Sequence, residues 1–160
     1  MRPFVLGAAT ALMMLAGTAQ QAWACRADQV EIKGDFGTVR FRIEVADTPA
    51  SRAQGLMFVR QMPQMSGMLF VYERPESVSF WMENTPIPLD MIFADATGTI
   101  QRVHAEAIPF DRTPIPGGEG IQYVLEINGG LAADFGIDAG DVMRHPAITQ
   151  NMAVWPCGAP

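Results

Sequence analysis

The side chains best suited to chemistry lie close together in the middle of the sequence, in the stretch SFWMENTPIPLDMIF at positions 79–93. Four of them offer a ligand an aromatic face, hydrogen-bonding groups or a carboxylate: Trp81, Asn84, Thr85 and Asp90. Pro86 and Pro88 fix their own backbone angles, and a rigid loop loses little conformational entropy when it binds. The stretch therefore predicts a ligand-binding loop. The structural alternative is a turn in which the indole belongs to the core and the polar side chains bond to loop amides.

Two charged residues elsewhere in the chain complete this candidate set. Arg52 comes just after Thr48 and Pro49, which form a helix N-cap followed by proline at the first helical position. Glu126 interrupts the apolar strand pattern IQYVLEI, and a charge in such a strand needs a partner. One interpretation is a partly buried ion pair between Arg52 and Glu126. The other is that Arg52 binds the carboxylate or phosphate of a ligand beside the 81–90 loop.

Paired carboxyl groups could also support glycoside hydrolysis, in which two of them flank the scissile bond. That alternative makes the protein a carbohydrate-active enzyme that uses Asp90 with Glu126 or Glu83. Catalysis by a nucleophile and a base needs a histidine beside Ser, Cys or Thr. The sequence has two histidines, His104 in a strand pattern and His145 before a proline. We expect no catalytic residue, and a non-catalytic binding or accessory role is the leading prediction.

Three methionines suggest a further alternative. Met62, Met65 and Met68 follow one another at M-x-x-M-x-x-M spacing. Thioethers bind Cu(I), so the alternative is a periplasmic Cu(I)-binding protein. Methionine is also an ordinary gap-filler in hydrophobic cores. The leading prediction therefore includes no cofactor.

The elements that must position these residues are mostly strands. In TVRFRIEVA at 38–46, apolar and charged residues alternate, which is typical of a half-buried strand. Similar signals predict strands at 30–33, 67–73, 77–82, 90–95, 99–108 and 121–127. Short helices are predicted after Thr48 and over GGLAADFG at 129–136. The pattern predicts a mainly β fold, a β-barrel or sandwich of about seven strands with two short helices.

Turn residues predict how some of these strands connect. The strands at 67–73 and 77–82 are expected to form a hairpin across RPE, and those at 90–95 and 99–108 to form one across ATG. The segment PFDRTPIPGGEG at 109–120 is rich in proline and glycine. It predicts a mobile flap over one end of the sheet.

The first 24 residues differ in kind from the rest. They carry Arg2, an apolar run and the ending Ala22-Trp23-Ala24, which is the pattern of a secretory signal peptide. The apolar run is too short for a comfortable membrane span. The sequence therefore predicts an exported protein, periplasmic or secreted, whose mature residues 25–160 form one mainly β domain without a stable membrane span.

The sequence has two cysteines, Cys25 and Cys157. In an oxidising compartment an even pair indicates a disulfide, which here would join the two ends of the mature chain. The alternative is a lipoprotein acylated on Cys25, although the position three residues earlier is Ala22 rather than the usual leucine. The sequence contains no C-x-x-C motif, which argues against a redox enzyme.

Charge narrows the choice of partners. Seventeen acidic residues exceed eleven basic ones, for a formal net charge of −6 at pH 7. The sequence shows no basic patch, which argues against binding to nucleic acid or to anionic membrane surfaces. A small molecule or a component of the cell envelope is the expected partner.

Five blocks of the sequence resemble a known family. They are GLM at 55–57, GMLFVY at 67–72, FWMENTPIPLDMIFAD at 80–95, YVLEINGG at 123–130 and GIDAGD at 136–141. In this order they are similar to domain-of-unknown-function family 192, also called uncharacterised protein family 0127, over about residues 29–145. The resemblance implies a compact, mainly β domain found in secreted or envelope proteins. It implies no established activity.

Overall fold

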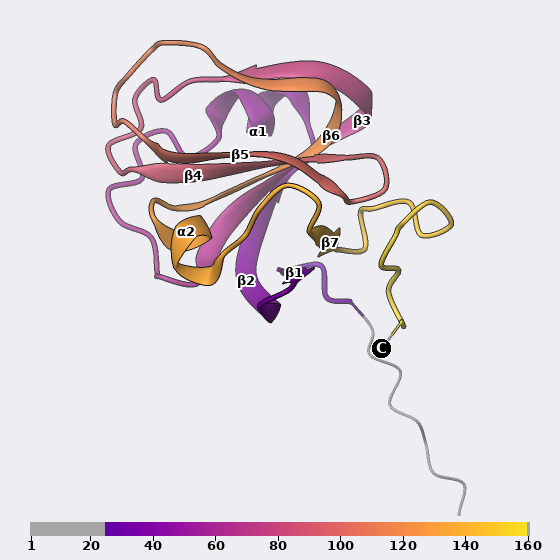
Figure 1. Ribbon diagram of the computed structural model, residues 1–160. Coiled ribbons are helices and arrows are strands. Elements are labelled where there is room, and N and C mark those ends of the chain that lie inside the picture. Colours follow the sequence, from indigo (N-terminus) through magenta and orange to yellow (C-terminus); the bar gives the residue numbers. More distant parts are fainter. Residues whose placement is uncertain (1–24, 160) are drawn as a thin grey trace, which may run out of the picture.

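The computed structural model of the protein describes residues 25–159 (Figure 1). The signal peptide predicted for residues 1–24 lies outside this range and stays a prediction. Seven strands and two short helices follow one another along the described chain: β1 Gln29–Gly34, β2 Gly37–Ala46, α1 Pro49–Gln54, β3 Ser66–Phe80, β4 Leu89–Asp95, β5 Ile100–Ala107, β6 Ile115–Asn128, α2 Leu131–Phe135 and β7 Val142–Arg144. Within this range, no helix combines the length and the hydropathy that crossing a membrane requires.

The strands form one curled sheet in the order β5-β4-β6-β3-β2-β1-β7. Neighbouring strands are antiparallel except β2 and β3, which are parallel because the chain crosses over through α1 between them. The two ends of the sheet meet where a bridge joins Thr99, in the β4–β5 turn, to Val142 of β7. The sheet is therefore a half-barrel, and the prediction of a mainly β, barrel-like fold with seven strands and two short helices is confirmed.

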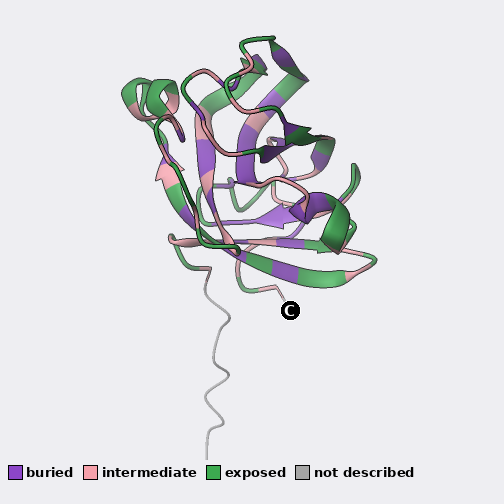
Figure 2. Ribbon diagram, turned by 90° about the vertical axis from the view of Figure 1, so that its left-hand side faces the viewer, coloured by how far each residue is buried: buried purple, intermediate pink, exposed green. Residues whose placement is uncertain are grey.

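Both faces of the central strands are buried. Consecutive residues of β4 and β6 are buried, and Figure 2 marks the buried stretches of the ribbon in purple. Successive side chains of a strand point to opposite faces, so neighbouring residues of β6 enter different cores. Leu125 packs with Phe41 in the cluster inside the curl, whereas Val124 packs with Phe70 and Phe93 in the cluster on the other face. Glu126 shares the face of Val124, because the two positions are two residues apart.

Helix α1 begins at the predicted N-cap. The Thr48 hydroxyl accepts a hydrogen bond from the Ser51 amide at 3.1 Å, and the Ser51 hydroxyl accepts one from the Thr48 amide at 3.0 Å. This capping box satisfies two backbone donors that a helix start leaves without partners. No residue of α1 is buried, so the helix depends on its cap and on a few side-chain contacts rather than on a packed face.

Two connections differ from the predictions. The hairpin across RPE is not formed, because β3 continues through these residues and pairs with β6 along its length, with irregular register between Val71 and Ser79. Half of the predicted flap at 109–120 is not a loop, because β6 begins at Ile115. Gly117 lets β6 pass over the core there, since an added Cβ would lie 2.4 Å from the Phe93 ring.

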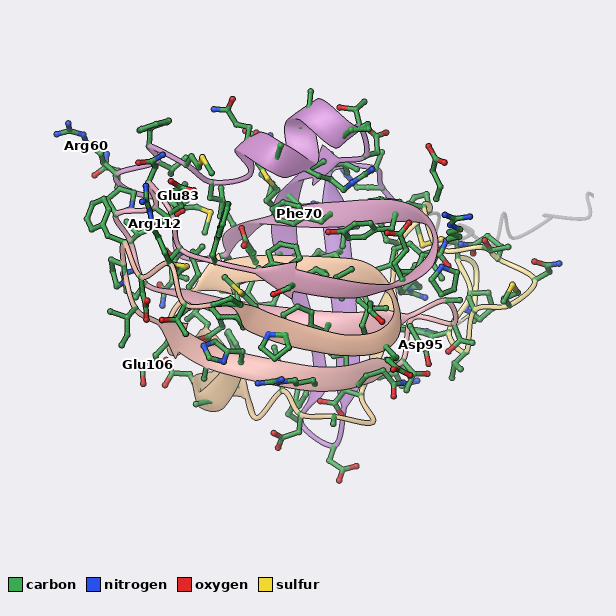
Figure 3. All side chains as sticks on the ribbon, turned by 90° about the horizontal axis from the view of Figure 1, so that it is seen from above. Arg60, Phe70, Glu83, Asp95, Glu106 and Arg112 are labelled. Carbon is green, nitrogen blue, oxygen red and sulfur yellow. A yellow bond between two sulfur atoms is a disulfide. The ribbon has the colours of Figure 1, made fainter. Side chains whose placement is uncertain are left out.

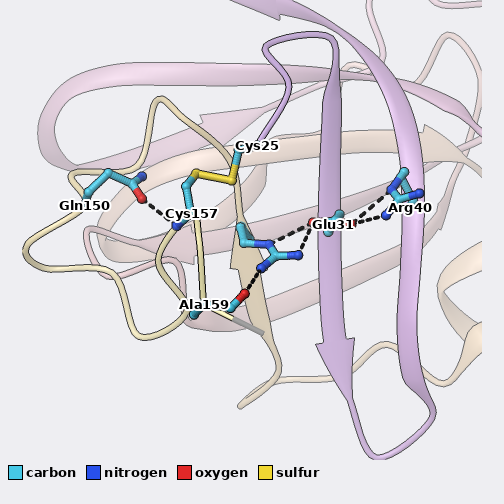
Figure 4. A network of polar contacts seen from close by, with 7 residues as sticks. Cys25, Glu31, Arg40, Gln150, Cys157 and Ala159 are labelled. Carbon is cyan, nitrogen blue, oxygen red and sulfur yellow. Dashed lines mark hydrogen bonds and ion pairs between the residues drawn. A yellow bond between two sulfur atoms is a disulfide. The ribbon is translucent and has the colours of Figure 1, made fainter. Parts of the chain in front are cut away.

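The ends of the described chain are tied to β1 and β7. Cys25 and Cys157 form the predicted disulfide (Figure 4). Arg144 donates to the Glu31 carboxylate at 2.8 Å and to a carbonyl group near the C-terminus, and its guanidinium lies 3.8 Å from the centre of the Trp155 ring. Because the Cys25 sulfur is used in the disulfide, it cannot also carry the thioether of a lipoprotein.

Candidate functional site

A cavity of about 260 Å³ lies between the C-terminal end of α1, strands β3 and β6, and the loop that follows β3. Its polar and aromatic lining includes four of the six residues predicted for a ligand site: Arg52, Trp81, Thr85 and Glu126. Phe70, Tyr72 and Phe80 also belong to its walls, and we call this cavity the Arg52–Glu126 pocket. Asn84 and Asp90 are not part of its lining.

Glu126 is the most deeply placed polar residue of the Arg52–Glu126 pocket. It is 4 % exposed, and its neighbours across the sheet are Met68 of β3 and Met91 of β4. Its carboxyl group makes no hydrogen bond or ion pair with another described residue. Burial therefore raises the pKa of Glu126 to about 8, so the carboxyl group is mainly protonated at neutral pH.

Arg52 is held in place without an acidic partner. Its Nη1 donates to the carbonyl groups of Asp47 at 2.7 Å and Val71 at 2.8 Å, and its guanidinium lies 4.9 Å from the centre of the Tyr72 ring. The ion pair between Arg52 and Glu126 that the sequence suggested is not formed, because these contacts hold the guanidinium while the carboxyl group stays among apolar neighbours. Within residues 25–159, the Nε and Nη2 atoms of Arg52 have no protein acceptor.

Tyr72 supplies a phenol to the pocket walls, besides the hydroxyl groups of Ser79 and Thr85. It is half-buried, and burial raises the pKa of its phenol above the usual value, against the effect of the nearby Arg52 charge. The phenol therefore keeps its proton at neutral pH and can donate a hydrogen bond. The sequence analysis did not select Tyr72, although its alternation with Phe70 in GMLFVY already places both side chains on one face.

Trp81 is accessible to a ligand. Its side chain is 52 % exposed, so the indole belongs to the pocket wall rather than to the core. Thr85 is buried, and its hydroxyl donates to the Glu83 carbonyl at 3.1 Å, so it shapes the loop more than it offers a free group. Asn84 is exposed in left-handed backbone conformation, with φ of 53°, and serves as a turn residue.

Both carboxylate oxygens of Asp90 accept hydrogen bonds from backbone amides. Its Oδ1 accepts from the amides of Glu106 at 2.7 Å and Gly130 at 3.0 Å, and its Oδ2 accepts from the amide of Ala132 at 2.7 Å. The side chain has no exposed surface. It joins β4 to the end of β5 and to the start of α2, which is the structural alternative that the sequence analysis described for this residue.

Asp90 and Glu126 also lie on opposite faces of the sheet. Asp90 pairs with Ile127, and Glu126 pairs with Met91. Because side chains of paired residues share a face and those of successive residues alternate, the two carboxyl groups point away from each other. The structure does not bring Asp90 and Glu126 together, and they are one of the two carboxyl pairs that the carbohydrate-active alternative could use.

The rim beside the pocket is made of three loops joined by hydrogen bonds. The Phe58 amide donates to the Asn84 carbonyl at 2.7 Å, and the Phe110 amide donates to the Thr85 carbonyl at 3.1 Å. Phe58 and Phe110 both have positive φ and are more than 60 % exposed. Non-glycine residues in this conformation cost free energy and tend to occur at functional sites. These phenylalanines could not be identified from the sequence, because the residue type of Phe58 and Phe110 does not indicate a left-handed backbone conformation.

Charges at this rim are compensated within the protein. Glu83, which lines the pocket, forms an ion pair with Arg112 from the loop after β5 (Figure 3). The same view shows Arg60 on this side of the molecule, away from that pair. The Glu83 carboxylate is therefore neutralised by Arg112.

The methionines predicted as a copper site are divided between the two cores. Met62 and Met68 pack against the cluster that contains Phe70, and Met65 packs against the cluster inside the curl. The three thioethers therefore do not converge. Among the described residues, no group of three or more His, Cys, Asp or Glu side chains is arranged to hold a metal ion.

Two solved structures resemble this chain. A protein of unknown function from Novosphingobium aromaticivorans DSM 12444 is 43 % identical with a TM-score of 0.71, and the match covers 72 % of this chain and 82 % of that one. A Sinorhizobium meliloti 1021 protein, whose description proposes a role as a transcription regulator, is 37 % identical with a TM-score of 0.71. That match covers 75 % of this chain and 94 % of the other. Comparison with curated proteins gives no match.

The family comparison agrees with the resemblance seen in the sequence blocks. Residues 29–145 match DUF192, which is described as Uncharacterized ACR. The matched range includes all the residues that line the Arg52–Glu126 pocket, and it ends before Cys157 of the disulfide. The chain belongs to the DUF192 family.

Proposed function

We propose that this protein is a non-catalytic binding domain whose ligand is a small molecule, or a small part of an envelope component, held in the Arg52–Glu126 pocket. The main support for the proposal is that the guanidinium of Arg52, the carboxyl group of Glu126 and the accessible indole of Trp81 line the same cavity. Among residues 25–159, Arg52 has no acidic partner and Glu126 has no hydrogen-bond partner, and Trp81 is half exposed in the same lining. A buried polar group without a partner costs free energy, which a ligand would recover.

A binding role fits the pocket better than catalysis does. Neither histidine lines it: His104 is on β5, and the His145 ring contacts the Ala27 carbonyl and the Ala147 amide. The other acidic residue of the lining, Glu83, forms an ion pair with Arg112. The pocket therefore offers recognition groups and no matched pair of acid and base.

The site of action that we propose is the periplasm or the extracellular medium. The disulfide between Cys25 and Cys157 supports it, because disulfides persist in oxidising compartments. The signal-peptide pattern of residues 1–24 supports it independently. Ligands available there include sugars, organic acids, amines and fragments of the envelope.

The role in transcription proposed for the Sinorhizobium meliloti relative is not part of this proposal. This chain has a formal net charge of −6, and DNA binding depends on basic residues that neutralise phosphates. Two arginines near the rim, Arg52 and Arg112, are engaged by carbonyl groups or by a carboxylate.

The test is a thermal-shift and NMR screen of the mature protein with sugars, organic acids and amines. A ligand raises the melting temperature by mass action, and it should shift the indole resonance of Trp81. Trp81→Ala should weaken binding of each hit about tenfold or more, because an aromatic contact contributes roughly 1.5–3 kcal/mol. Phe110→Ala, which removes an exposed aromatic residue of the rim that does not line the pocket, is the matched control.

Two results would overturn the proposal. One is that hits bind Trp81→Ala and Phe110→Ala as they bind the wild-type protein. The other is that no compound of the panel changes the melting temperature or the Trp81 resonance at millimolar concentration.

A further inference from the structure

The chemistry of the Arg52–Glu126 pocket defines a class of ligand. The charged and titratable groups that face Glu126 come from three elements: Arg52 on α1, Tyr72 on β3 and Glu83 in the following loop. From β4, the residue opposite Glu126 is Met91, which carries no charge. Glu83 is neutralised by Arg112, and burial keeps Tyr72 and Glu126 protonated. The pocket thus carries one uncompensated positive charge, that of Arg52.

Arg52 and Glu126 both offer hydrogen-bond donors to a ligand in the pocket. Arg52 has free N–H groups on Nε and Nη2, because only Nη1 is used by the Asp47 and Val71 carbonyls. A protonated carboxyl group at Glu126 offers one further O–H donor. A ligand group that accepts from both donors and carries a single negative charge also compensates the Arg52 charge. A carboxylate meets both conditions, since its two oxygens can each accept hydrogen bonds.

The cavity is small and also has aromatic walls. Phe70 and Phe80 form its walls, and their rings meet edge to face with centroids 5.0 Å apart. The volume of about 260 Å³ is below the ~300–1,000 Å³ that is typical of sites for drug-sized ligands. A compact hydrocarbon or aromatic body therefore fits between these rings and Trp81.

We propose that the Arg52–Glu126 pocket binds small monocarboxylates, with the carboxylate between the Arg52 guanidinium and the Glu126 carboxyl group and the apolar body against Trp81. This inference rests on the proposed binding function and names its ligand class. A phosphate dianion fits less well, because it brings two negative charges to one cation. An amino acid fits less well, because its ammonium group requires Glu126 to lose its proton among apolar neighbours.

The experiment is calorimetric titration of the mature protein with hexanoate and phenylacetate and with the matching amides, hexanamide and phenylacetamide. We expect each acid to bind at least tenfold more tightly than its amide at pH 6.5. Arg52→Gln should remove that preference, and Arg60→Gln, which neutralises an exposed arginine outside the pocket lining, should leave it unchanged. Circular dichroism of each variant checks that the fold is retained.

The pH dependence tests Glu126 itself. The affinity of the wild-type protein for phenylacetate should fall about tenfold per pH unit above the Glu126 pKa of about 8. Deprotonation of Glu126 removes its O–H donor and adds a negative charge that repels the carboxylate of the ligand. Glu126→Gln should still bind phenylacetate, since the amide donates a hydrogen bond, and its affinity should not change between pH 6.5 and pH 9.5.

The outcomes separate this inference from the proposed function. If amides bind as tightly as acids and Trp81→Ala weakens both, the pocket binds ligands but the carboxylate inference is overturned. It is also overturned if phenylalanine binds more tightly than phenylacetate and its affinity rises with pH, since Glu126 would then act as a carboxylate. If neither these probes nor any other compound binds in a manner that depends on Trp81, both proposals fail.

Discussion

Asp90 and Glu126 show how the surroundings of a residue decide its role. Both are acidic, both are nearly inaccessible, and they lie on the adjacent strands β4 and β6. Asp90 accepts three backbone hydrogen bonds, whereas Glu126 accepts none and faces a cavity. A carboxylate that is held by amides is structural, and one that is left among apolar side chains keeps its proton and remains available.

The structural role of Asp90 can be measured. Asp90→Ala leaves three buried or partly buried amides without an acceptor, so we expect the free energy of unfolding to fall by about 3 kcal/mol or more in urea titrations. Asp90→Asn keeps one acceptor oxygen, so its free energy of unfolding should lie between those of Asp90→Ala and the wild-type protein. Asp134→Asn, on the exposed side of α2, is the control and should change stability little. An Asp90→Ala protein as stable as this control would contradict the assignment.

The protonation of Glu126 makes stability depend on pH. The folded state holds the proton until about pH 8, whereas the unfolded chain releases it near the usual glutamate pKa of 4.5. Between these values the folded state binds more protons, so the contribution of Glu126 to stability falls as pH rises from about 4.5 to about 8. Above and below this window the contribution is constant.

Glu126→Gln removes this dependence. We expect the difference in unfolding free energy between Glu126→Gln and the wild-type protein to shift in favour of the variant from pH 5 to pH 8, by on the order of 3 kcal/mol. Glu83→Gln, a paired and more accessible carboxylate, serves as the control. A constant difference across this range would show that Glu126 is ionised in the folded protein at pH 5.

At the scale of elements, helix α1 positions Arg52 in the lining of the pocket. It carries Arg52 in its last turn but buries no residue of its own, so its position depends on the capping box and on the Arg52 contacts. Elements with few buried contacts open locally at low free-energy cost. The arginine that we assign to ligand binding therefore sits on one of the less strongly packed elements of the molecule.

Removing the cap should loosen α1 without unfolding the sheet. Thr48→Ala costs a helix about 1 kcal/mol, so we expect amide hydrogen exchange in α1 to accelerate about fivefold while exchange in β4 and β6 is unchanged. Phenylacetate should also bind more weakly, because Arg52 is less often in place. Thr113→Ala, in an exposed loop, is the control. Equal acceleration in the α1 and the sheet amides would contradict a local role for the cap.

The elements with regular patterns were predictable from the sequence, and the irregular ones were not. Alternation in TVRFRIEVA predicted 38–46, and the strand is Gly37–Ala46. The turn at ATG was predicted from Gly98, which has φ of 82°. The long β3–β6 ribbon was missed, because its proline and glycine residues are typical of turns and only the partner strand shows that they are irregularities within a pair.

The candidate site was predictable only in part, for a similar reason. Charge and aromaticity identified Arg52, Trp81 and Glu126, which the fold brings to one pocket. Asp90 has the same side chain whether it binds a ligand or three amides, and those amides belong to β5 and α2. Its role depended on contacts between distant segments, which a single sequence does not report.

At the scale of the whole molecule, the disulfide and the pocket lie in different parts of the fold. Figure 1 shows α1 and the β3–β6 ribbon on one side and β7 with the C-terminal segment on the other. The disulfide closes a loop with a sequence separation of 132, and Arg144 adds its contacts with Glu31 and Trp155 nearby. None of these residues lines the pocket. Stability and ligand binding should therefore respond separately to changes at the chain ends.

Replacing both cysteines tests this separation. Cys25→Ala combined with Cys157→Ala should lower the free energy of unfolding by about 2–4 kcal/mol, because the cross-link restricts the unfolded chain, with a correspondingly lower urea midpoint. The pocket residues keep their contacts in the folded state, so the affinity for phenylacetate at low temperature should stay within about twofold of the wild-type value. Reductant added to the double variant is the control and should change neither quantity. A double variant that keeps its stability but loses binding would show that the chain ends are coupled to the pocket, since only a rearrangement reaching α1 or β6 could produce that result.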